Sequence, residues 1–487
     1  MFLSLDQGTS SSRALVWDEG GRVVASAQRS VESSFPRPGW VEQSPSEIWD
    51  TQLEAARQVA AQVGVERIRA VAIANQRETA LIWKRATLEP IGPAIVWQCR
   101  RTASVAAQLD DLHGEQIRFR SGLQPDAYFS GPKFSWLLNH ADPALRARDR
   151  AEAGELACGT VDTWLLAKLT GGAVHATDVT NASRTMLWNL SDRDWDKQLC
   201  SWQGVPMSML PEARPSGSEY GLTEASLLGK ALPILAVAGD QQAALYGHGI
   251  TSPGAAKCTY GTGAFLLSHA EPEADAESTP DGLLLTAAVD GGLALEGGVF
   301  TAGSVVQWLR DELELAPSAS EISALAASTD TSGGVMLIPA LAGLGSPHWD
   351  PDARGAILGL TRGTTKAQIA RAALEAVAFR VREILEAMEA GAGPIAELRV
   401  DGGMTSSDEM LQIQANALQR PIVRPATQET TAFGVARLAM EVSGLDAVIE
   451  MDEDRFEPNA DLESAFQRWS AARRAIQTLS PDGDLTE

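Results

Sequence analysis

The chain opens with a strand pattern, a polar turn and a second strand pattern, and the same arrangement returns near its middle. Phe2–Leu5 and Ala14–Trp17 are apolar runs on either side of a turn that contains Gly8 and Thr9. Residues 257–265 (KCTYGTGAF) again place a Gly-Thr pair between two strand-forming runs. Such an echo indicates an internal duplication in which each half begins with a hairpin. The length of 487 residues exceeds what one hydrophobic core usually organises and also favours two domains.

Glycine and proline mark the expected boundary between the halves. The segment 247–254 contains Pro253 and several glycines. We therefore predict an N-terminal domain over 1–247 and a C-terminal domain over 254–450. Residues 451–487 are acid-rich, and we expect a solvated helical tail there.

Strand and helix patterns alternate within both halves. Residues 70–74, 234–238 and 398–400 are short apolar runs that suit buried strands. Over 369–388, apolar residues recur at steps of three or four and predict a long amphipathic helix. Ser44, Pro45 and Glu47 predict a helix start closed by a capping box. This alternation predicts an α/β fold.

Charge and cysteine usage narrow the classes of partner and compartment. The formal net charge of −23 gives the surface a field that repels phosphate backbones and anionic lipids, so nucleic-acid and membrane partners are disfavoured. The four cysteines form no CxxC pair, which fits a reduced cytoplasm. The sequence shows no targeting segment or apolar run long enough to span a membrane. We expect a cytoplasmic protein.

Polar residues directly follow two of the predicted strands. Asn75 to Thr79 (NQRET) follow the first, and Gly239-Asp240 follow the second. Arg77 and Glu78 offer a donor and an acceptor side by side, although an exposed ion pair would look the same in sequence. Asp240 is placed to accept a proton from an attacking hydroxyl, the alternative being a helix N-cap.

The first turn has the chemistry of a phosphate site. Residues 6–13 (DQGTSSSR) combine a carboxylate for a hydrated metal ion, a glycine for close backbone approach, hydroxyl donors and a cation. The candidate phosphate-binding residues are Thr9, Ser10, Ser11 and Arg13, with Asp6 and Asp240 as candidates for Mg²⁺. An ordinary Ser/Thr-rich hairpin turn is the alternative. Neither a P-loop nor a Rossmann glycine motif occurs, so the grip on phosphate is of another kind.

Taken together, these segments resemble the FGGY carbohydrate kinases, and most of all the members that act on glycerol. The resemblance is carried by DQGTSSSR, NQRET, GDQQAAL and YGTGAF, and continues in order through PGWVEQ, IVWQCRRT, GTVDTW, TNASRTML, FTAGSVVQWLRD, SPHWDPDARGAILGLTRG and VDGGM. It implies an actin-like ATPase fold with two ribonuclease-H-like domains and an active-site cleft between them. It also implies ATP and Mg²⁺ as cofactors and glycerol as the acceptor.

The resemblance extends the set of candidate site residues. It implies that Tyr128 and Gln241 contact the polyol hydroxyls, together with Arg77, Glu78 and Asp240, while Trp97 and Phe265 wall its carbon chain. For ATP it implies Thr262, Gly303, Gln307 and Gly403. Ser407 stands where the family usually has Asn near the adenine, and Asp126-Ala127-Tyr128-Phe129 replaces Asp-Pro-Tyr-Phe, which loosens the loop that carries Tyr128.

Two other functions fit parts of the same pattern. A related kinase for another small polyol or ketose would share the ATP residues and differ around the acceptor. A non-catalytic, actin-like ATP-binding module would work through partner proteins, and the polyol-facing residues argue against it. The family resemblance also implies homodimers or homotetramers.

Overall fold

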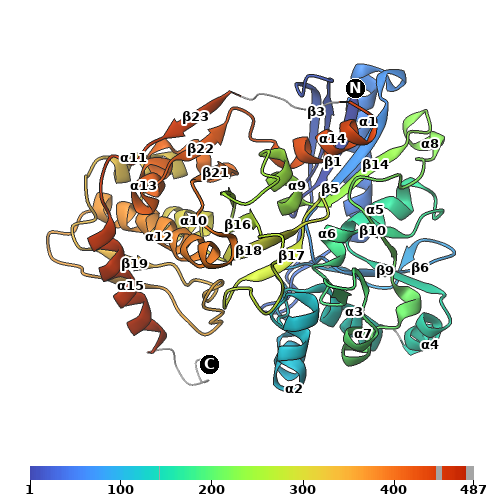
Figure 1. The fold of residues 1–487 in the computed structure, drawn as a ribbon, viewed down its shortest axis with the longest axis horizontal. Helices are drawn as coiled ribbons and strands as arrows, with labels where there is room; N and C mark the ends of the chain where they lie inside the picture. Colours follow the sequence, from blue (N-terminus) through green and yellow to red (C-terminus); the bar gives the residue numbers. More distant parts are fainter. Residues whose placement is uncertain (142, 446–451, 479–487) are drawn as a thin grey trace.

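A computed structural model describes residues 1–141, 143–445 and 452–478. A five-stranded sheet organises the first half of the chain (Figure 1). Its order is β14 (Ile234–Gly239), β5 (Ala70–Asn75), β1 (Phe2–Gln7), β2 (Ser11–Trp17) and β3 (Val23–Ser30). β1, β2 and β3 are antiparallel neighbours, whereas β5 and β14 run parallel to β1. All residues of β1, β5 and β14 are buried, which explains their continuous apolar runs.

A seven-stranded sheet organises the second half and repeats this topology. Its order is β17 (Leu284–Ala287), β18 (Leu293–Val299), β16 (Ala264–His269), β15 (Ala255–Tyr260), β21 (Glu397–Asp401), β22 (Ile422–Pro425) and β23 (Glu453–Phe456). β15, β16 and β18 are antiparallel neighbours, and β21 and β22 continue the sheet in parallel with β15. Three antiparallel strands followed by two parallel ones thus occur in both halves. The predicted duplication and the two ribonuclease-H-like sheets are confirmed.

Helices surround both sheets, and short strands outside the two sheets lie in the segments that connect the main elements. The helices of the first half are α1 (Pro45–Val63), α2 (Ala103–Ser121), α3 (Ser130–His140), α4 (Ala147–Glu152), α5 (Val161–Leu169), α6 (Val179–Ala182), α7 (Lys197–Gln203), α8 (Ala225–Leu228) and α9 (Asp240–Gly247). Those of the second half are α10 (Gly303–Asp311), α11 (Ala319–Ala327), α12 (Lys366–Ala392), α13 (Asp408–Leu418), α14 (Thr430–Val442) and α15 (Glu463–Gln477). The remaining strands are β4 (Glu42–Gln43), β6 (Leu81–Lys84), β7 (Glu89–Pro90), β8 (Ala94–Ile95), β9 (Leu156–Gly159), β10 (Ala176–Asp178), β11 (Trp188–Asn189), β12 (Asp194–Trp195), β13 (Glu212–Arg214), β19 (Met336–Ile338) and β20 (Ala356–Leu358). In the described part of the chain, no helix has the length and hydropathy needed to cross a bilayer.

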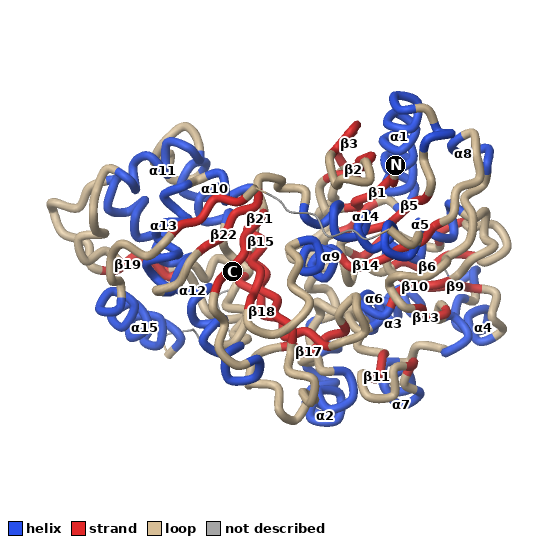
Figure 2. The backbone as a smooth tube through the Cα atoms, turned by 45° about the horizontal axis from the view of Figure 1, so that its top comes forward, coloured by secondary structure: helices blue, strands red, loops and turns tan. Residues whose placement is uncertain are grey.

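Helix α14 belongs to the second half by sequence but packs on the sheet of the first. Figures 1 and 2 show it beside β1 and β5, across the molecule from β21 and β22. Phe433 of α14 lies 5.4 Å from Trp17 between ring centroids, in one core with Phe2 and Ala72. The predicted domain over 254–450 therefore gives one of its helices to the other lobe.

The segment 452–478 is integrated into the second half and is not a solvated tail. β23 pairs with β22, and α15 buries Phe466 and Trp469 in the core of this lobe. Trp469 Nε1 also donates a hydrogen bond to the carbonyl of Leu337 at 2.8 Å. The expected helix is present, but its apolar face packs inward. The proposed boundary between 450 and 451 lies outside the described residues.

Candidate active site

The carboxyl ends of β5 and β14 bring the predicted polar residues together. These strands are parallel neighbours with Gly239 opposite Asn75, so the residues after them emerge at the same edge of the sheet. Arg77 Nε lies 3.4 Å from Asp240 Oδ1 and 3.8 Å from Glu78 Oε1. Arg77 and Glu78 are 2% exposed, which excludes the surface ion pair, whereas the Asp240 side chain is 27% exposed.

Two charged residues that the sequence analysis missed complete this cluster. Glu296 in β18 accepts hydrogen bonds from both Nη atoms of Arg77, at 2.6 and 2.7 Å. Arg184, after α6, binds Glu78 at 2.5 Å and lies 3.3 Å from Glu296. Burial alone would raise the pKa of Glu296, but Arg184 and Arg77 lower it to about 2. An acidic residue inside the apolar run 293–299 was the one available signal for Glu296.

Three aromatic rings pack together near the cluster, where the guanidinium carbon of Arg184 lies 5.4 Å from the ring centroid of Tyr128. Trp97 lies 5.7 Å from Tyr128 and 5.8 Å from Phe265 between ring centroids, both in edge-on contact. Trp97 Nε1 donates to Thr9 Oγ1 at 2.9 Å and so ties this wall to the first hairpin turn. Trp97 and Tyr128 come from the first half and Phe265 from β16 of the second. The predicted walls therefore meet where the two halves face each other.

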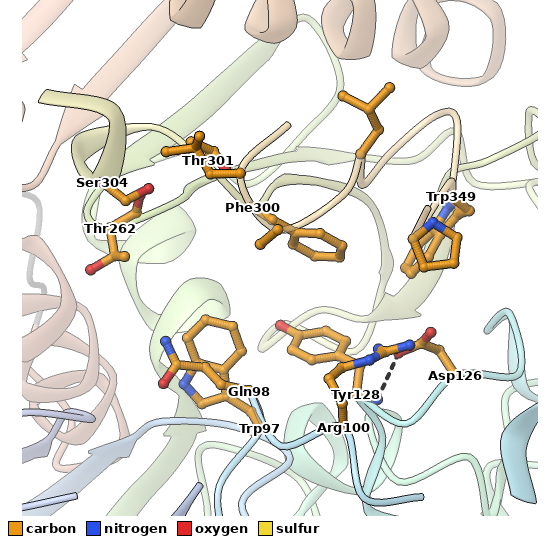
Figure 3. Close-up of a pocket in the computed structure, with 14 residues that line it drawn as sticks. Trp97, Gln98, Arg100, Asp126, Tyr128, Thr262, Phe300, Thr301, Ser304 and Trp349 are labelled. Carbon is orange, nitrogen blue, oxygen red and sulfur yellow. Dashed lines mark hydrogen bonds and ion pairs between the residues drawn. The ribbon is translucent and has the colours of Figure 1, made fainter. Parts of the chain in front are cut away.

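A cavity of about 440 Å³ is lined by Trp97 and Tyr128 together with residues from both halves of the chain, although its lining does not include Phe265, Arg77, Glu78, Asp240 or Gln241. In Figure 3, Trp97, Gln98, Arg100, Asp126 and Tyr128 face Thr262, Phe300, Thr301, Ser304 and Trp349 across it. The first set belongs to the first half of the chain and the second set to the second half. The predicted cleft between the domains is therefore present at this position.

The loop that carries Tyr128 is held in place despite its departure from the family pattern. Asp126 Oδ1 accepts hydrogen bonds from Tyr128 N at 2.8 Å and from Arg100 Nη1 at 2.6 Å. The buried Lys133 donates to the carbonyls of Tyr128 at 2.6 Å and Glu78 at 3.1 Å. Burial lowers the pKa of Lys133 to about 7. These contacts hold the backbone around Tyr128 without a proline at position 127.

Asp6, Asp240 and Glu429 form an acidic environment next to the first turn. Burial raises the pKa of Asp6 to about 7, with Glu429 and Asp240 adding to the rise and Arg13 opposing it. Burial also raises the pKa of Asp240, in spite of Arg77. Arg13 Nη1 binds Glu429 at 2.7 Å, a partner that the sequence analysis did not foresee. Among the described residues, no group of three or more His, Cys, Asp or Glu side chains is arranged to enclose a metal ion.

The two hairpin turns place their hydroxyl residues differently. In the first turn Gly8 N donates to the carbonyl of Ser11 at 2.9 Å, Ser10 is exposed, and Ser11 is buried. In the second turn Thr262 is exposed, and its carbonyl accepts from Ala302 N and Ser304 N at 2.9 and 3.1 Å. Gly303 N donates to the carbonyl of Gly261 at 3.0 Å, which fixes the start of α10 beside this turn.

A second cavity, of about 540 Å³, opens beyond this turn. Its lining includes Gly303, Gln307, Gly403 and Ser407, four of the residues expected to contact ATP. No protein atom lies within 4 Å of where a Cβ of Gly403 would stand, so this backbone can be approached closely. Ser407 Oγ accepts a hydrogen bond from Met410 N at 3.1 Å and so caps the start of α13. The hydroxyl of Ser407, the residue that stands in place of the family's Asn, is therefore already used in a hydrogen bond within the protein.

Comparisons with known proteins match both halves of the chain to one family. The N-terminal domain of the FGGY family of carbohydrate kinases matches residues 1–247, and its C-terminal domain matches residues 256–441. The chain is 51% identical to a glycerol kinase of Polaromonas naphthalenivorans (strain CJ2) over 98% of this chain and 95% of that protein. It is 49% identical to a glycerol kinase of Acidovorax sp. (strain JS42), over 96% of this chain and 98% of that protein.

A solved structure shows the same fold over the whole length. Glycerol kinase of Plasmodium falciparum, crystallised with ADP, superposes with a TM-score of 0.89 at 32% identity, and the match covers 99% of this chain and 98% of that one. The two-domain α/β architecture is thus the actin-like ATPase fold. With both family domains matched along the sequence and close relatives over nearly its full length, the chain belongs to the FGGY family of carbohydrate kinases.

Proposed function

We propose that this kinase transfers the γ-phosphoryl group of ATP to a terminal hydroxyl of glycerol, giving ADP and sn-glycerol 3-phosphate. The observation that carries the proposal is the cluster of Arg77, Glu78 and Asp240 beside three aromatic walls where the two halves meet. The glycerol kinases at 51% and 49% identity support glycerol as the acceptor.

A short polyol matches the hydrogen-bonding capacity of this cluster. Because Glu296 holds both Nη atoms of Arg77, Nε is the donor that faces Asp240 and Glu78. A hydroxyl group can accept from Arg77 and donate to Glu78, and Tyr128 and Gln241 add further polar contacts. Trp97 and Phe265 cover the carbon chain. Sites that pair buried polar groups with substrate hydroxyls reject analogues lacking them by about 10⁴ to 10⁵.

Asp240 is the proposed general base for the attacking hydroxyl. It begins α9 at the carboxyl end of β14, and it is the partly exposed carboxylate of the cluster. Its raised pKa makes it a better proton acceptor than an ordinary aspartate. Positioned bases contribute about 10² to 10⁴ in rate.

ATP binds, in this proposal, between the two hairpin turns. Thr9, Ser10, Ser11 and Arg13 approach the phosphates from the first half, and Thr262 approaches from the second. Gly303, Gln307 and Gly403 surround the nucleoside in the 540 Å³ cavity, with Ser407 at its edge. Backbone N–H groups at such turns suit phosphate oxygens.

The residues around Asp6 fit a magnesium ion. Glu429 and Asp240 both raise the pKa of the buried Asp6, so a cation beside these carboxylates would offset unfavourable negative charge. Asp6, through water, and Asp240 would hold the ion. Mg²⁺ supplies charge neutralisation for the transferring phosphoryl group.

A coupled-ADP assay over a panel of acceptors tests the proposal. Glycerol is expected to give the highest kcat/KM, above longer polyols and ketoses, and Asp240→Asn is expected to abolish turnover while ATP binding persists. A preference for another acceptor would assign a related kinase activity. ATP binding without turnover on any acceptor would point to a non-catalytic module.

Size-exclusion chromatography tests the predicted dimer or tetramer.

A further inference from the structure

Lys257 is a fully buried lysine on β15 whose ammonium group lies next to the proposed acceptor site. It donates hydrogen bonds to Gln241 Oε1 and to Thr259 Oγ1, the latter at 2.9 Å. Gln241 lies in the first turn of α9, directly after Asp240. This contact therefore links the sheet of the second half to the residue beside the proposed base.

The chemistry of the lysine fixes the orientation of the glutamine amide. An ammonium group has three donors and no acceptor, so the Gln241 atom that faces it has to be the amide oxygen. The amide nitrogen Nε2 then points away from Lys257. Within 1–141, 143–445 and 452–478, no residue accepts a hydrogen bond from Nε2, and Nε2 is not among the enclosed polar atoms that lack a partner. Its protons are therefore available to a ligand.

Lys257 is itself held from the other side. Its second acceptor, Thr259, lies two residues along the same strand, opposite Asp401 of β21 in the sheet register, and the Thr259 side chain contributes to the lowered pKa of Asp401. Asp401 in turn binds His248 Nε2 at 2.9 Å and the hydroxyl of Thr430. When the residues that hydrogen-bond to a site residue are themselves held in place, the site residue keeps the geometry that a substrate requires.

We propose that Lys257 is a positioning residue for the acceptor: it holds Gln241 in the orientation in which Nε2 donates to a hydroxyl of the polyol. The inference rests on the proposed function, because the contact between Gln241 and the acceptor is part of it. Nothing in the sequence motifs assigns this role to Lys257.

Charge compensation is the competing role for Lys257. Burial lowers the pKa of Lys257, while the nearby Asp401 and Asp240 raise it. A lysine that only balances these carboxylates would affect stability and overall rate, but it would not influence which acceptor hydroxyl is recognised. The direct bond to Gln241 makes the two roles separable.

A double-mutant cycle on kcat/KM for glycerol tests the proposal. The proteins are wild type, Lys257→Met, Gln241→Ala and the double variant. We expect Lys257→Met to lower kcat/KM about tenfold, the effect of one lost hydrogen bond to substrate. The double variant is expected to lie within about twofold of Gln241→Ala, because Lys257 acts through Gln241. Losses that multiply in the double variant would overturn the proposal.

A second measurement remains valid if Lys257→Met is partly misfolded. The ratio of kcat/KM for glycerol to that for 1,2-propanediol, and to that for 1,3-propanediol, does not depend on the fraction of active enzyme. Gln241→Ala identifies the hydroxyl that Gln241 contacts, because its ratio falls for the diol that lacks this hydroxyl. Lys257→Met is expected to lower the same ratio, and equal losses on all three acceptors would overturn the proposal.

The outcomes separate this inference from the proposed function. If Lys257→Met does not fold at all, Lys257→Gln is measured in the same way, with the same two ratios deciding. Wild-type protein that is inactive on glycerol would overturn the proposed function and this inference with it. Wild-type activity with multiplicative losses would overturn the role of Lys257 alone.

Discussion

The guanidinium group of Arg77 and the carboxylate of Glu296 form a bidentate ion pair, with Nη–Oε distances of 2.6 and 2.7 Å. Both side chains are 2% exposed. Arg77 follows β5 and Glu296 lies in β18, so the pair joins the two sheets beside the proposed acceptor site. Two parallel hydrogen bonds fix the direction of the guanidinium plane as well as its position.

Glu296→Gln is expected to lower the free energy of unfolding by about 3 to 5 kcal/mol, because it leaves the buried charge of Arg77 without its main partner. The KM for glycerol is expected to rise as well, since Arg77 Nε loses its fixed direction. Urea denaturation and steady-state kinetics measure the two effects. Glu54→Gln, at the exposed pair of Arg29 and Glu54 with N···O 3.3 Å, is the control and should cost less than about 1 kcal/mol. Equal losses in the free energy of unfolding for Glu296→Gln and Glu54→Gln would show that the buried ion pair is no more important for stability than the exposed one.

Lys133 is expected to make stability rise with pH above neutrality. Its folded-state pKa of about 7 lies below the ordinary 10.5, so between these values the unfolded chain binds one proton more than the folded protein. The free energy of unfolding should then increase by about 1.4 kcal/mol per pH unit relative to a chain without this lysine. Urea denaturation of wild type and Lys133→Met at pH 7, 8 and 9 isolates the contribution. Parallel pH profiles for the two proteins would show that Lys133 keeps an ordinary pKa.

The crossing of α9 and α14 depends on two glycines. A Cβ at Gly434 would lie 1.9 Å from the carbonyl oxygen of Ala243, and one at Gly247 would lie 2.1 Å from that of Thr430. Gly434→Ala is expected to push the helices apart and to cost about 3 kcal/mol in the free energy of unfolding. Gly363→Ala, where the nearest atom is 3.9 Å away, is the control and should change it by no more than about 1 kcal/mol. A Gly434→Ala protein as stable as this control would rule out a tight crossing.

Local sequence patterns predicted the paired hairpins and the central strands well. The run Phe2–Leu5 lies in β1, residues 70–74 in β5, and residues 369–388 in α12, because buried parallel strands and amphipathic helices leave clear periodicities. The capping box at Ser44 was only half correct. Ser44 accepts from Glu47 N, but the Glu47 carboxylate accepts from Glu32 N, a contact made by tertiary structure.

Local sequence patterns did not predict the contacts between segments that are distant in the chain. The apolar residues of α14 do not indicate which of the two sheets they pack against. After residue 450 the acidic composition favoured a solvated segment, although Phe466 and Trp469 form an apolar face that is buried. At the site, strand ends pointed to Arg77, Glu78 and Asp240. Arg184 and Lys257 lie within the segments TNASRTML and KCTYGTGAF, but these segments do not indicate which distant residues they bind, so only the fold reveals their partners.

Gly403→Ala tests the assignment of the second cavity to the nucleotide. Gly403 lines this cavity, and an added Cβ would meet no protein atom within 4 Å, so the free energy of unfolding should change by no more than about 1 kcal/mol. The methyl group would instead occupy space proposed for ATP, and the KM for ATP is expected to rise about tenfold, with the KM for glycerol nearly unchanged. Gly402→Ala is the matched contrast, because Gly402 has φ +90° and its Cβ would lie 2.4 Å from the carbonyl oxygen of Tyr260, so this variant should be destabilised. If Gly403→Ala left the KM for ATP unchanged, the nucleoside would have to bind elsewhere.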